Sequence, residues 1–317
     1  MSSTVTPQMV RHAVERILPL ARRTPVVTSR SIDDRAGLRA WFKCENLQRG
    51  GAFKIRGASN LVLSIPPADL PRGVVAFSSG NHAQATAIAA RHVGAPATIV
   101  MPDDAPRAKM QSTRDAGARI VTYNRFTDDR EAIAAAVLEE TKGTLVPPFD
   151  HPLIIAGQGT AALELMEDVP EFDALVVCVG GGGLISGCAT IAKSIRPGIR
   201  IFGVEPELAN DTYLSCASGE RVTIASPDTI ADGLRAPAPG KLTFPIIQQH
   251  VEQILLVTED EIRATMRFIL ERMKILVEPS GAVAAAALLF GKLPRDVRTA
   301  GVIISGGNVD VEFLATV

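Results

Sequence analysis

The stretch Leu175-Val176-Val177-Cys178-Val179-Gly180-Gly181-Gly182-Gly183-Leu184 joins a strand, a glycine loop and the start of a helix. Its apolar half predicts a buried strand, and a helical pattern runs on from residue 184 to 195. Glycines at such a junction let backbone N–H groups crowd around an anion, and the helix N-terminus adds a favourable dipole. We therefore predict a phosphate-binding loop at 180–183, for which a flexible turn is the simpler alternative. The loop lacks both nucleotide-binding fingerprints, so a mononucleotide-sized phosphate fits better than NAD or ATP.

Strand and helix patterns alternate along most of the rest of the chain. The first helix begins at Pro7 behind the N-cap Thr6, and a capping box at residues 258–261 starts another. Alternation of this kind predicts an α/β fold with parallel strands, in which ligands bind beyond the carboxyl ends of the strands. The candidate strands are residues 40–44, 74–77, 97–101, 119–122, 174–179, 200–204, 253–257 and 301–304.

Two proline pairs mark the joints of an inserted unit. Pro66-Pro67 precedes the β-α pattern of residues 73–145, and Pro147-Pro148 follows it. We predict a small inserted α/β domain at 69–147 and a large domain formed by 1–68 and 148–317. A cleft between two such domains is a natural site for a small molecule.

Composition and charge exclude several classes of partner. Apolar residues make up 46% and aromatic residues 4% of the chain, which suits an aliphatic core around a parallel sheet. The net charge of −1, without a basic tail, gives no support for binding to nucleic acid or an anionic membrane. We see neither a secretory leader nor an apolar run of about 18 residues, and expect a soluble cytoplasmic protein. The cysteines and histidines lack zinc-binding spacing, and we expect reduced core thiols at Cys44, Cys178, Cys188 and Cys216.

The segment 46–58, NLQRGGAFKIRGA, places Lys54 between the apolar residues Phe53 and Ile55, just after a glycine pair. Burial disfavours an ammonium ion, so a lysine in this setting loses its proton readily. A neutral lysine amine attacks carbonyl groups, and pyridoxal phosphate (PLP) is a carbonyl cofactor that uses one. The simple alternative is an ordinary lysine at the start of a helix.

Polar clusters follow two other strands. Ser78-Ser79-Gly80-Asn81-His82 follows the strand 74–77 and opens a helix, where hydroxyl and backbone N–H groups could receive a carboxylate. Ser305-Gly306-Gly307-Asn308 follows the last strand. Each cluster taken alone also reads as a cap or a turn, as does the segment 278–281 before an alanine-rich helix.

Together these segments resemble the fold-type II PLP enzymes, tryptophan synthase β-like two-domain proteins, and within them the serine/threonine dehydratase and serine racemase group. The resemblance runs from about residue 7 to 310. It rests on motifs that occur in family order, at residues 51–57, 78–82, 155–160, 180–183, 231–233 and 305–310.

The resemblance implies a role for each matching position. Lys54 would bind PLP covalently and then act as the base at the substrate Cα. The phosphate would lie on Gly180, Gly181, Gly182, Gly183 and Leu184. Asn81 would donate to the phenolic oxygen of PLP, Phe53 would pack against its ring, Ser305 would face the ring nitrogen, and Glu278 would lie near the cofactor. The substrate carboxylate would be seated by Ser78, Ser79, Gly80 and His82.

The resemblance also implies a cation site. Glu205, Asp211 and the backbone carbonyl of Ala209 match its pattern, and hard oxygen ligands suit Mg²⁺ or Ca²⁺. Two surface carboxylates in a loop are an equally good interpretation.

Three reactions remain open within this group. The first is β-elimination from L-threonine or L-serine, which gives a 2-oxo acid and ammonia. The second is serine racemisation, for which Ser79 would be the acid or base on the opposite face, although the segment 232–237 lacks the serine found in racemases. The third is 3-hydroxyaspartate ammonia-lyase activity, with Arg130 contacting the acidic side group. An amino-acid- or nucleotide-binding module without catalysis is the non-enzyme alternative, against which the intact Lys54 argues. Family members are commonly homodimers, and the chain ends without room for a C-terminal regulatory domain, so we expect a standalone enzyme.

Overall fold

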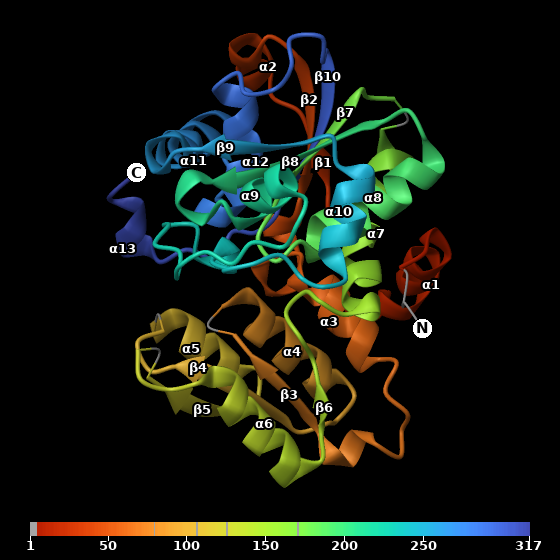
Figure 1. The fold of residues 1–317 in the computed structure, drawn as a ribbon, viewed down its shortest axis with the longest axis vertical. Helices are drawn as coiled ribbons and strands as arrows, with labels where there is room; N and C mark the ends of the chain where they lie inside the picture. The colour runs from red at the N-terminus through yellow and green to blue at the C-terminus, as the bar shows by residue number, and fades with distance from the viewer. Residues whose placement is uncertain (1–4, 79, 106, 125, 170) are drawn as a thin grey trace.

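A computed structural model describes residues 5–78, 80–105, 107–124, 126–169 and 171–317, except for the side chains of residues 107, 108, 130 and 131. Within these ranges the strands form two separate sheets (Figure 1). The larger sheet contains, in spatial order, β1 Val26–Val27, β2 Arg39–Cys44, β10 Thr299–Ile304, β7 Ala174–Cys178, β8 Arg200–Pro206 and β9 Gln253–Val257. The smaller contains β5 Arg119–Tyr123, β4 Ala97–Pro102, β3 Val74–Phe77 and β6 Thr144–Leu145.

Almost every neighbouring pair of strands is parallel, which confirms the predicted α/β class. The exception is β1, which pairs with β2 in the antiparallel direction. The sequence did not predict β1 or β6. Each is only a two-residue strand, too short to show the alternation from which a strand is predicted.

The helices lie in the sequence mostly between these strands. They are α1 Pro7–Ile17, α2 Arg30–Ala36, α3 Lys54–Val62, α4 Asn81–His92, α5 Arg107–Asp115, α6 Arg130–Thr141, α7 Pro152–Asp168, α8 Gly183–Ile195, α9 Asp211–Ser218, α10 Thr243–His250, α11 Glu259–Met273, α12 Pro279–Leu289 and α13 Val311–Leu314. Thr6 caps α1 through its side chain, and Thr258 and Glu261 form the predicted capping box of α11.

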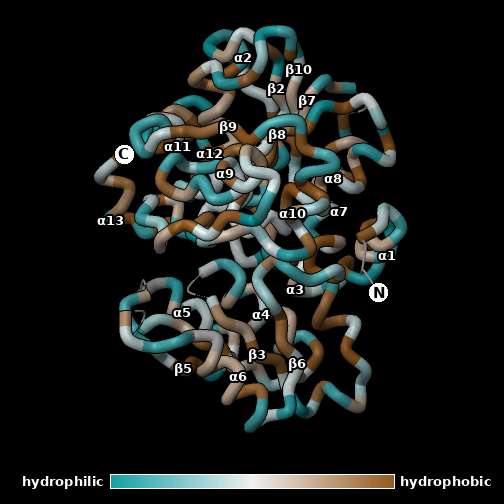
Figure 2. Tube along the Cα trace, viewed as in Figure 1, coloured by the Kyte–Doolittle hydropathy of each residue, from teal (hydrophilic) through white to brown (hydrophobic). Residues whose placement is uncertain are grey.

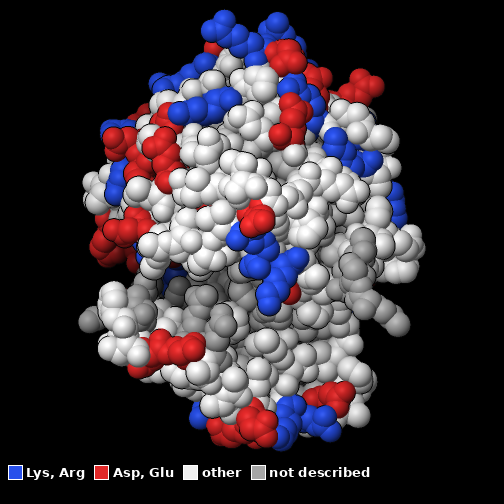
Figure 3. All heavy atoms as spheres, in the orientation of Figure 1, with Lys and Arg blue, Asp and Glu red and all other residues white. Residues whose placement is uncertain are grey.

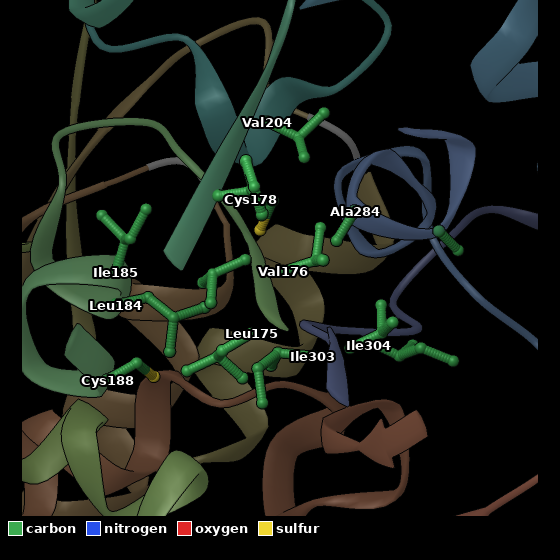
Figure 4. Close-up of a cluster of buried hydrophobic side chains, with 14 of the residues drawn as sticks. Leu175, Val176, Cys178, Leu184, Ile185, Cys188, Val204, Ala284, Ile303 and Ile304 are labelled. Atoms are coloured by element: carbon green, nitrogen blue, oxygen red, sulfur yellow. The ribbon is translucent and has the colours of Figure 1, made fainter. Parts of the chain in front are cut away.

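The core of the larger sheet is aliphatic. Helix α12 is buried along its whole length against β7, β8, β9 and β10, and α11 covers it. Figure 4 shows Val176 and Cys178 of β7 close to Ala284 of α12, with Ile303 of β10 beside Leu175 of β7. Along the chain trace, hydrophobic residues follow these strands while hydrophilic residues gather at the periphery (Figure 2).

The smaller sheet is covered on both faces because side chains alternate along a strand. Val74 and Ala76 of β3 join a cluster with alanines of α4, whereas Val75 joins a different cluster with Ala134 and Val137 of α6. Leu61 and Val62 of α3 also belong to the α4 cluster, and α3 packs against α7 as well as α4. The domain limits given above remain a prediction.

The arrangement brings the carboxyl ends of several strands to one region. Strands β2, β10 and β7 are parallel neighbours, so the segments that follow them emerge on the same edge of the larger sheet. A bridge between Ala52 and Gly306 ties the segment before Lys54 to the end of β10. The molecular surface in Figure 3 is hollowed between the upper, larger part and the lower, smaller part, with charges of both signs interspersed around it. No helix in the described part of the chain is long and apolar enough to cross a membrane.

Candidate active site

Lys54 begins α3, and its amine lies inside the protein. The Nζ atom donates a hydrogen bond to the backbone carbonyl of Pro148 at 2.9 Å. Burial lowers the pKa of this amine to about 8, although Cys178 and Glu278 nearby partly oppose the shift. Phe53, almost fully buried, donates its backbone N–H to the carbonyl of Ser305 at 3.0 Å and its ring lies 5.1 Å from Nζ. The structure therefore places an amine that deprotonates easily next to the end of β10.

The glycine loop has the predicted position, between β7 and α8. Gly182, with a φ of 88°, is the N-cap of α8, and Leu184 is buried in the first turn. A Cβ atom on Gly181 would lie 2.4 Å from the Phe149 ring, and one on Gly182 would lie 2.8 Å from Oγ1 of Thr243. The close approach of both neighbours requires glycine here and leaves the loop with bare backbone.

The polar cluster after β3 faces the same region. Asn81 begins α4, and its Nδ2 donates to Oε1 of Glu278 at 2.6 Å, across the gap between the smaller and larger sheets. Ser78 Oγ accepts from the backbone N–H of Gly80 at 3.2 Å. Ser79 lies outside the described residues. Arg130 begins α6, but its side chain is not among those described, so the structure does not place it relative to the site.

The ring of His82 is not available to donate a hydrogen bond to an anion. It is buried, and Nε2 lies 2.8 Å from the carbonyl of Val146, which can only accept a hydrogen bond. Burial, reinforced by Lys54, lowers the pKa of His82 to about 3, so the ring is neutral and its single N–H is already used. What His82 offers to a ligand is its backbone N–H in the first turn of α4.

Glu278 is a buried carboxyl group that stays protonated near neutral pH. Burial, reinforced by Asp232, raises its pKa to about 8, while Lys109 and the bond from Asn81 oppose the shift. Its Oε2 atom has no hydrogen-bond partner among the described residues. Ser305, also buried, donates its hydroxyl to the carbonyl of Ser280 at 3.2 Å.

Other residues of the site were not assigned a role from the sequence. Pro148 accepts the hydrogen bond from Lys54, and Phe149 packs against the glycine loop. Cys178 lies close enough to Ser305 for a hydrogen bond. Cys178 ends β7 two residues before Gly180, and that position could have signalled a site residue. The expectation of core thiols holds for Cys44, Cys178 and Cys188, but Cys216 is exposed; all are free thiols.

An ion pair lies next to this region. Lys109 of α5 pairs with Asp232, which begins a short 3₁₀ turn, Asp232–Leu234. A cavity of about 110 Å³ opens beside the pair. Among the described residues that line it, Lys109 is the one cation; these residues are Gly80, Asn81, Gln84, Lys109, Ser112, Asn308, Val309 and Asp310. A Cβ atom on Gly80 would lie 3.6 Å from Lys109 Nζ, so the ammonium lies beside the 78–82 segment.

The expected cation ligands lie elsewhere, at the end of β8 and in the segment that follows it. Glu205 and Asp211 are both fully buried, and Ala209 ends the 3₁₀ turn Glu207–Ala209 between them. Glu205 accepts backbone N–H groups of Thr212 and Tyr213, while Asp211 Oδ1 has no partner among the described residues. Burial raises the pKa of Asp211 to about 7 and, together with the Asp211 charge, raises that of Glu205. Two buried carboxylates that repel each other fit a bound cation, although no group of three or more His, Cys, Asp or Glu side chains suited to a metal occurs in the described ranges.

The residues around Lys54 fit PLP. The bare glycine backbone at a helix N-terminus suits its phosphate, the enclosed amine suits its aldehyde, and the unpartnered Glu278 oxygen lies in the same region. All three features belong to this chain's own geometry, independent of any relative.

Comparison with known proteins agrees. The chain is 49% identical over 307 residues to the L-threo-3-hydroxyaspartate ammonia-lyase of Saccharomyces cerevisiae, covering 97% of this chain and 94% of that protein. The structure of maize serine racemase matches with a TM-score of 0.95 and 42% identity, covering 100% of this chain and 97% of that one. The crystal structure of a T.th. threonine deaminase matches with a TM-score of 0.91 and 42% identity, covering 96% of this chain and 99% of that one.

These likenesses confirm the fold-type II architecture and the serine/threonine dehydratase and serine racemase group that the motifs indicated. The family model described as "Pyridoxal-phosphate dependent enzyme" matches residues 17–306, and the chain therefore belongs to the family of pyridoxal-phosphate dependent enzymes.

Proposed function

We propose that the protein is a PLP-dependent ammonia-lyase, a carbon–oxygen lyase that acts on a β-hydroxy amino acid. The reaction removes the α-proton and the β-hydroxyl group as water, and hydrolysis of the resulting enamine gives a 2-oxo acid and ammonia. The observation that carries this proposal is the enclosed amine of Lys54, whose pKa of about 8 makes a neutral base accessible near physiological pH. Bound PLP supplies the electron sink for the negative charge that develops at Cα.

The chain's own residues divide the remaining work. Lys54 would bind the cofactor and, once displaced by the substrate, take the proton from Cα. Backbone N–H groups of 180–184 would hold the phosphate, and Phe53 would pack on the ring. Asn81 has a second N–H, besides the one given to Glu278, for the phenolic oxygen. Ser305 would face the ring nitrogen, where a hydroxyl is a weak partner.

The substrate carboxylate would bind at the start of α4. Ser78, Ser79 and Gly80 would receive it together with the backbone N–H of His82, because the first N–H groups of a helix have no partner within that helix. The serine racemase alternative depends on Ser79 and rests on the sequence alone. Racemisation would need it as a second acid or base on the other face of Cα.

L-threonine and L-serine are the substrates we propose first, and 3-hydroxyaspartate is the second candidate. A specific observation favours the second: the Lys109 ammonium lies beside Gly80 at the cavity, where it could receive a distal carboxylate in place of Asp232. The similarity to a yeast protein named for that substrate also supports it. Arg130 stays a proposed contact on sequence grounds.

Three further properties are proposed on narrower support. Glu205, Asp211 and the Ala209 carbonyl would bind Mg²⁺ or Ca²⁺, since their buried negative charge needs a counterion. A homodimer is proposed on the family resemblance alone, and light scattering would test it. The free thiols suit the cytoplasm, where cysteines remain reduced.

The test is a visible spectrum of the purified protein with PLP, followed by L-threonine, L-serine and L-threo-3-hydroxyaspartate with detection of ammonia and 2-oxo acid. We expect a visible band and ammonia from at least one of the three. Lys54→Ala should lose both, whereas Lys142→Ala, at an exposed ion pair with Glu139, should keep both. Chiral analysis of serine in the same samples detects racemisation. Turnover by Lys54→Ala, or a band without ammonia from any substrate, would reject the lyase assignment.

A further inference from the structure

The side chain of Asn308 joins three segments of the site. It follows β10, and its Nδ2 donates to the backbone carbonyl of Gly50 at 2.7 Å and to Oδ1 of Asn81 at 2.9 Å. Gly50 lies in the segment 50–54 that leads to Lys54, which we call the lysine segment, and Asn81 begins α4, which packs on the smaller sheet. The amide of Asn308 therefore connects the lysine segment, the end of β10 in the larger sheet and the start of α4. A third contact, to Oε1 of Gln84, is longer at 3.5 Å.

The polarity of these bonds determines which way each amide points. A backbone carbonyl only accepts hydrogen bonds, so Asn308 must turn its nitrogen, not its oxygen, towards Gly50. Both N–H groups of Asn308 then have acceptors, and the atom of Asn81 that meets the second one must be its oxygen. The Gly50 carbonyl therefore determines the orientation of the Asn308 amide, which in turn determines the orientation of the Asn81 amide.

The orientation of Asn81 has a consequence inside the site. With its oxygen facing Asn308, its Nδ2 faces Glu278 Oε1 at 2.6 Å and keeps one N–H free. A reversed amide would instead present an oxygen to Glu278 and to any ligand oxygen beside it. An amide reverses by rotation about one bond, so Asn81 needs a neighbour that permits only one orientation.

The side chain of Asn308 has little room to change its orientation. A Cβ atom on Gly51 would lie only 2.2 Å from Asn308 Oδ1, so the amide lies directly against the Gly51 backbone, which has a φ of 71°. The backbone N–H of Gly307 also donates to the Gly51 carbonyl at 2.9 Å. The segment that bears Asn308 is therefore held against the lysine segment independently of its side chain.

We propose that Asn308 is a positioning residue that fixes the amide of Asn81 with its nitrogen towards the cofactor. It acts through Asn81, and the proposal rests on the proposed contact of Asn81 with the phenolic oxygen of PLP. Loss of the correct orientation would replace a donor at that oxygen by a repelling acceptor.

The deciding variant is Asn308→Asp. It keeps size and shape but has no N–H, so Asn81 should reverse to donate to the new carboxylate. We expect the dissociation constant of PLP, measured by absorbance titration, to rise about tenfold, as for one lost hydrogen bond, and the visible band to shift. Asn46→Asp is the matched control, because Asn46 is buried nearby and donates to the Leu276 carbonyl at 2.9 Å without touching Asn81. Its band position should be that of the wild type and its dissociation constant within about twofold.

Two further variants separate the possible failures. Asn308→Ser removes both donors without adding charge, and it should shift the band in the same direction if the aspartate variant does not fold. Asn81→Ala tests the underlying role of Asn81. An unchanged band in Asn81→Ala would reject that role, whereas a shifted band in Asn81→Ala together with wild-type behaviour of Asn308→Asp and Asn308→Ser would overturn the positioning proposal alone. Equal shifts in Asn308→Asp and Asn46→Asp would overturn it too, since they would indicate a general effect of buried charge.

Discussion

Arg56, two residues after Lys54 in α3, forms a bidentate ion pair with Glu45. Nε of Arg56 lies 2.7 Å from Oε2 of Glu45, Nη2 lies 2.8 Å from Oε1, and both side chains are fully buried. Arg56 also donates to both oxygens of Glu164 in α7. A single guanidinium thus ties α3, which begins with Lys54, to the end of β2 and to α7.

Removing this guanidinium should destabilise the folded protein. Arg56→Met leaves the buried carboxylate of Glu45 without its guanidinium partner and Glu164 with Lys43 alone, and we expect a loss of about 3–5 kcal/mol in the free energy of unfolding, measured by urea denaturation. Arg267→Met, which breaks the exposed pair with Glu271, is the control and should cost no more than about 1 kcal/mol. Similar losses in the two variants would show that the buried pair has no special stabilising role.

The glycine loop should not tolerate a side chain where Phe149 contacts it. In Gly181→Ala the new methyl group would meet the ring at 2.4 Å, so Phe149 must move, and the neighbouring Pro148 carbonyl accepts the bond from Lys54. We expect the affinity for PLP to fall at least about tenfold by absorbance titration. Gly198→Ala is the control, because nothing lies within 4 Å of its Cβ position. If the contact with the ring is the cause, the double variant Gly181→Ala/Phe149→Ala should recover most of the affinity.

The raised pKa of Glu278 predicts how the stability of the cofactor-free protein depends on pH. The ordinary pKa of 4.5 applies to the unfolded chain and about 8 to the folded one, so between these values the folded state binds the extra proton. Stability should therefore fall as pH rises from about 4.5 to about 8 and then level off. Glu278→Gln mimics the neutral acid and should remove this part of the decline, measured by urea unfolding at pH 5, 6.5 and 8. Glu271→Gln, at an exposed carboxylate, should decline like the wild type. An identical decline in Glu278→Gln would mean that this carboxyl is already ionised.

The buried carboxylates at the end of β8 and the start of α9 predict stabilisation by a divalent cation. Mg²⁺ or Ca²⁺ added to protein stripped with a chelator should raise the melting temperature by several degrees. Asp211→Asn should lose this response and, because it removes the repulsion of Glu205, should melt above the stripped wild type. Glu207→Gln changes an exposed carboxylate of the same loop and should respond like the wild type. A cation response that survives Asp211→Asn would locate the binding elsewhere.

The sequence by itself determined the features that depend on near neighbours along the chain. The apolar run ending at Cys178 and the glycines after it make a strand, a loop and a helix in that order, and Thr258 and Glu261 cap α11 as their spacing requires. Lys54 could be singled out because its neighbours are apolar and its motif has companions in a fixed order. Such signals are local, since helices and strands are set by periodicity and caps within a few residues.

The tertiary structure alone decided which distant groups meet. No spacing in the chain indicates that Asn308 donates to both Gly50 and Asn81, or that Lys109 pairs with Asp232, because each contact joins segments brought together only by folding. The same holds for His82, whose ring N–H donates to the Val146 carbonyl and is therefore not available to a substrate carboxylate. Hydrogen-bond direction and burial depend on the complete set of neighbours in space, and a one-dimensional pattern does not contain that set.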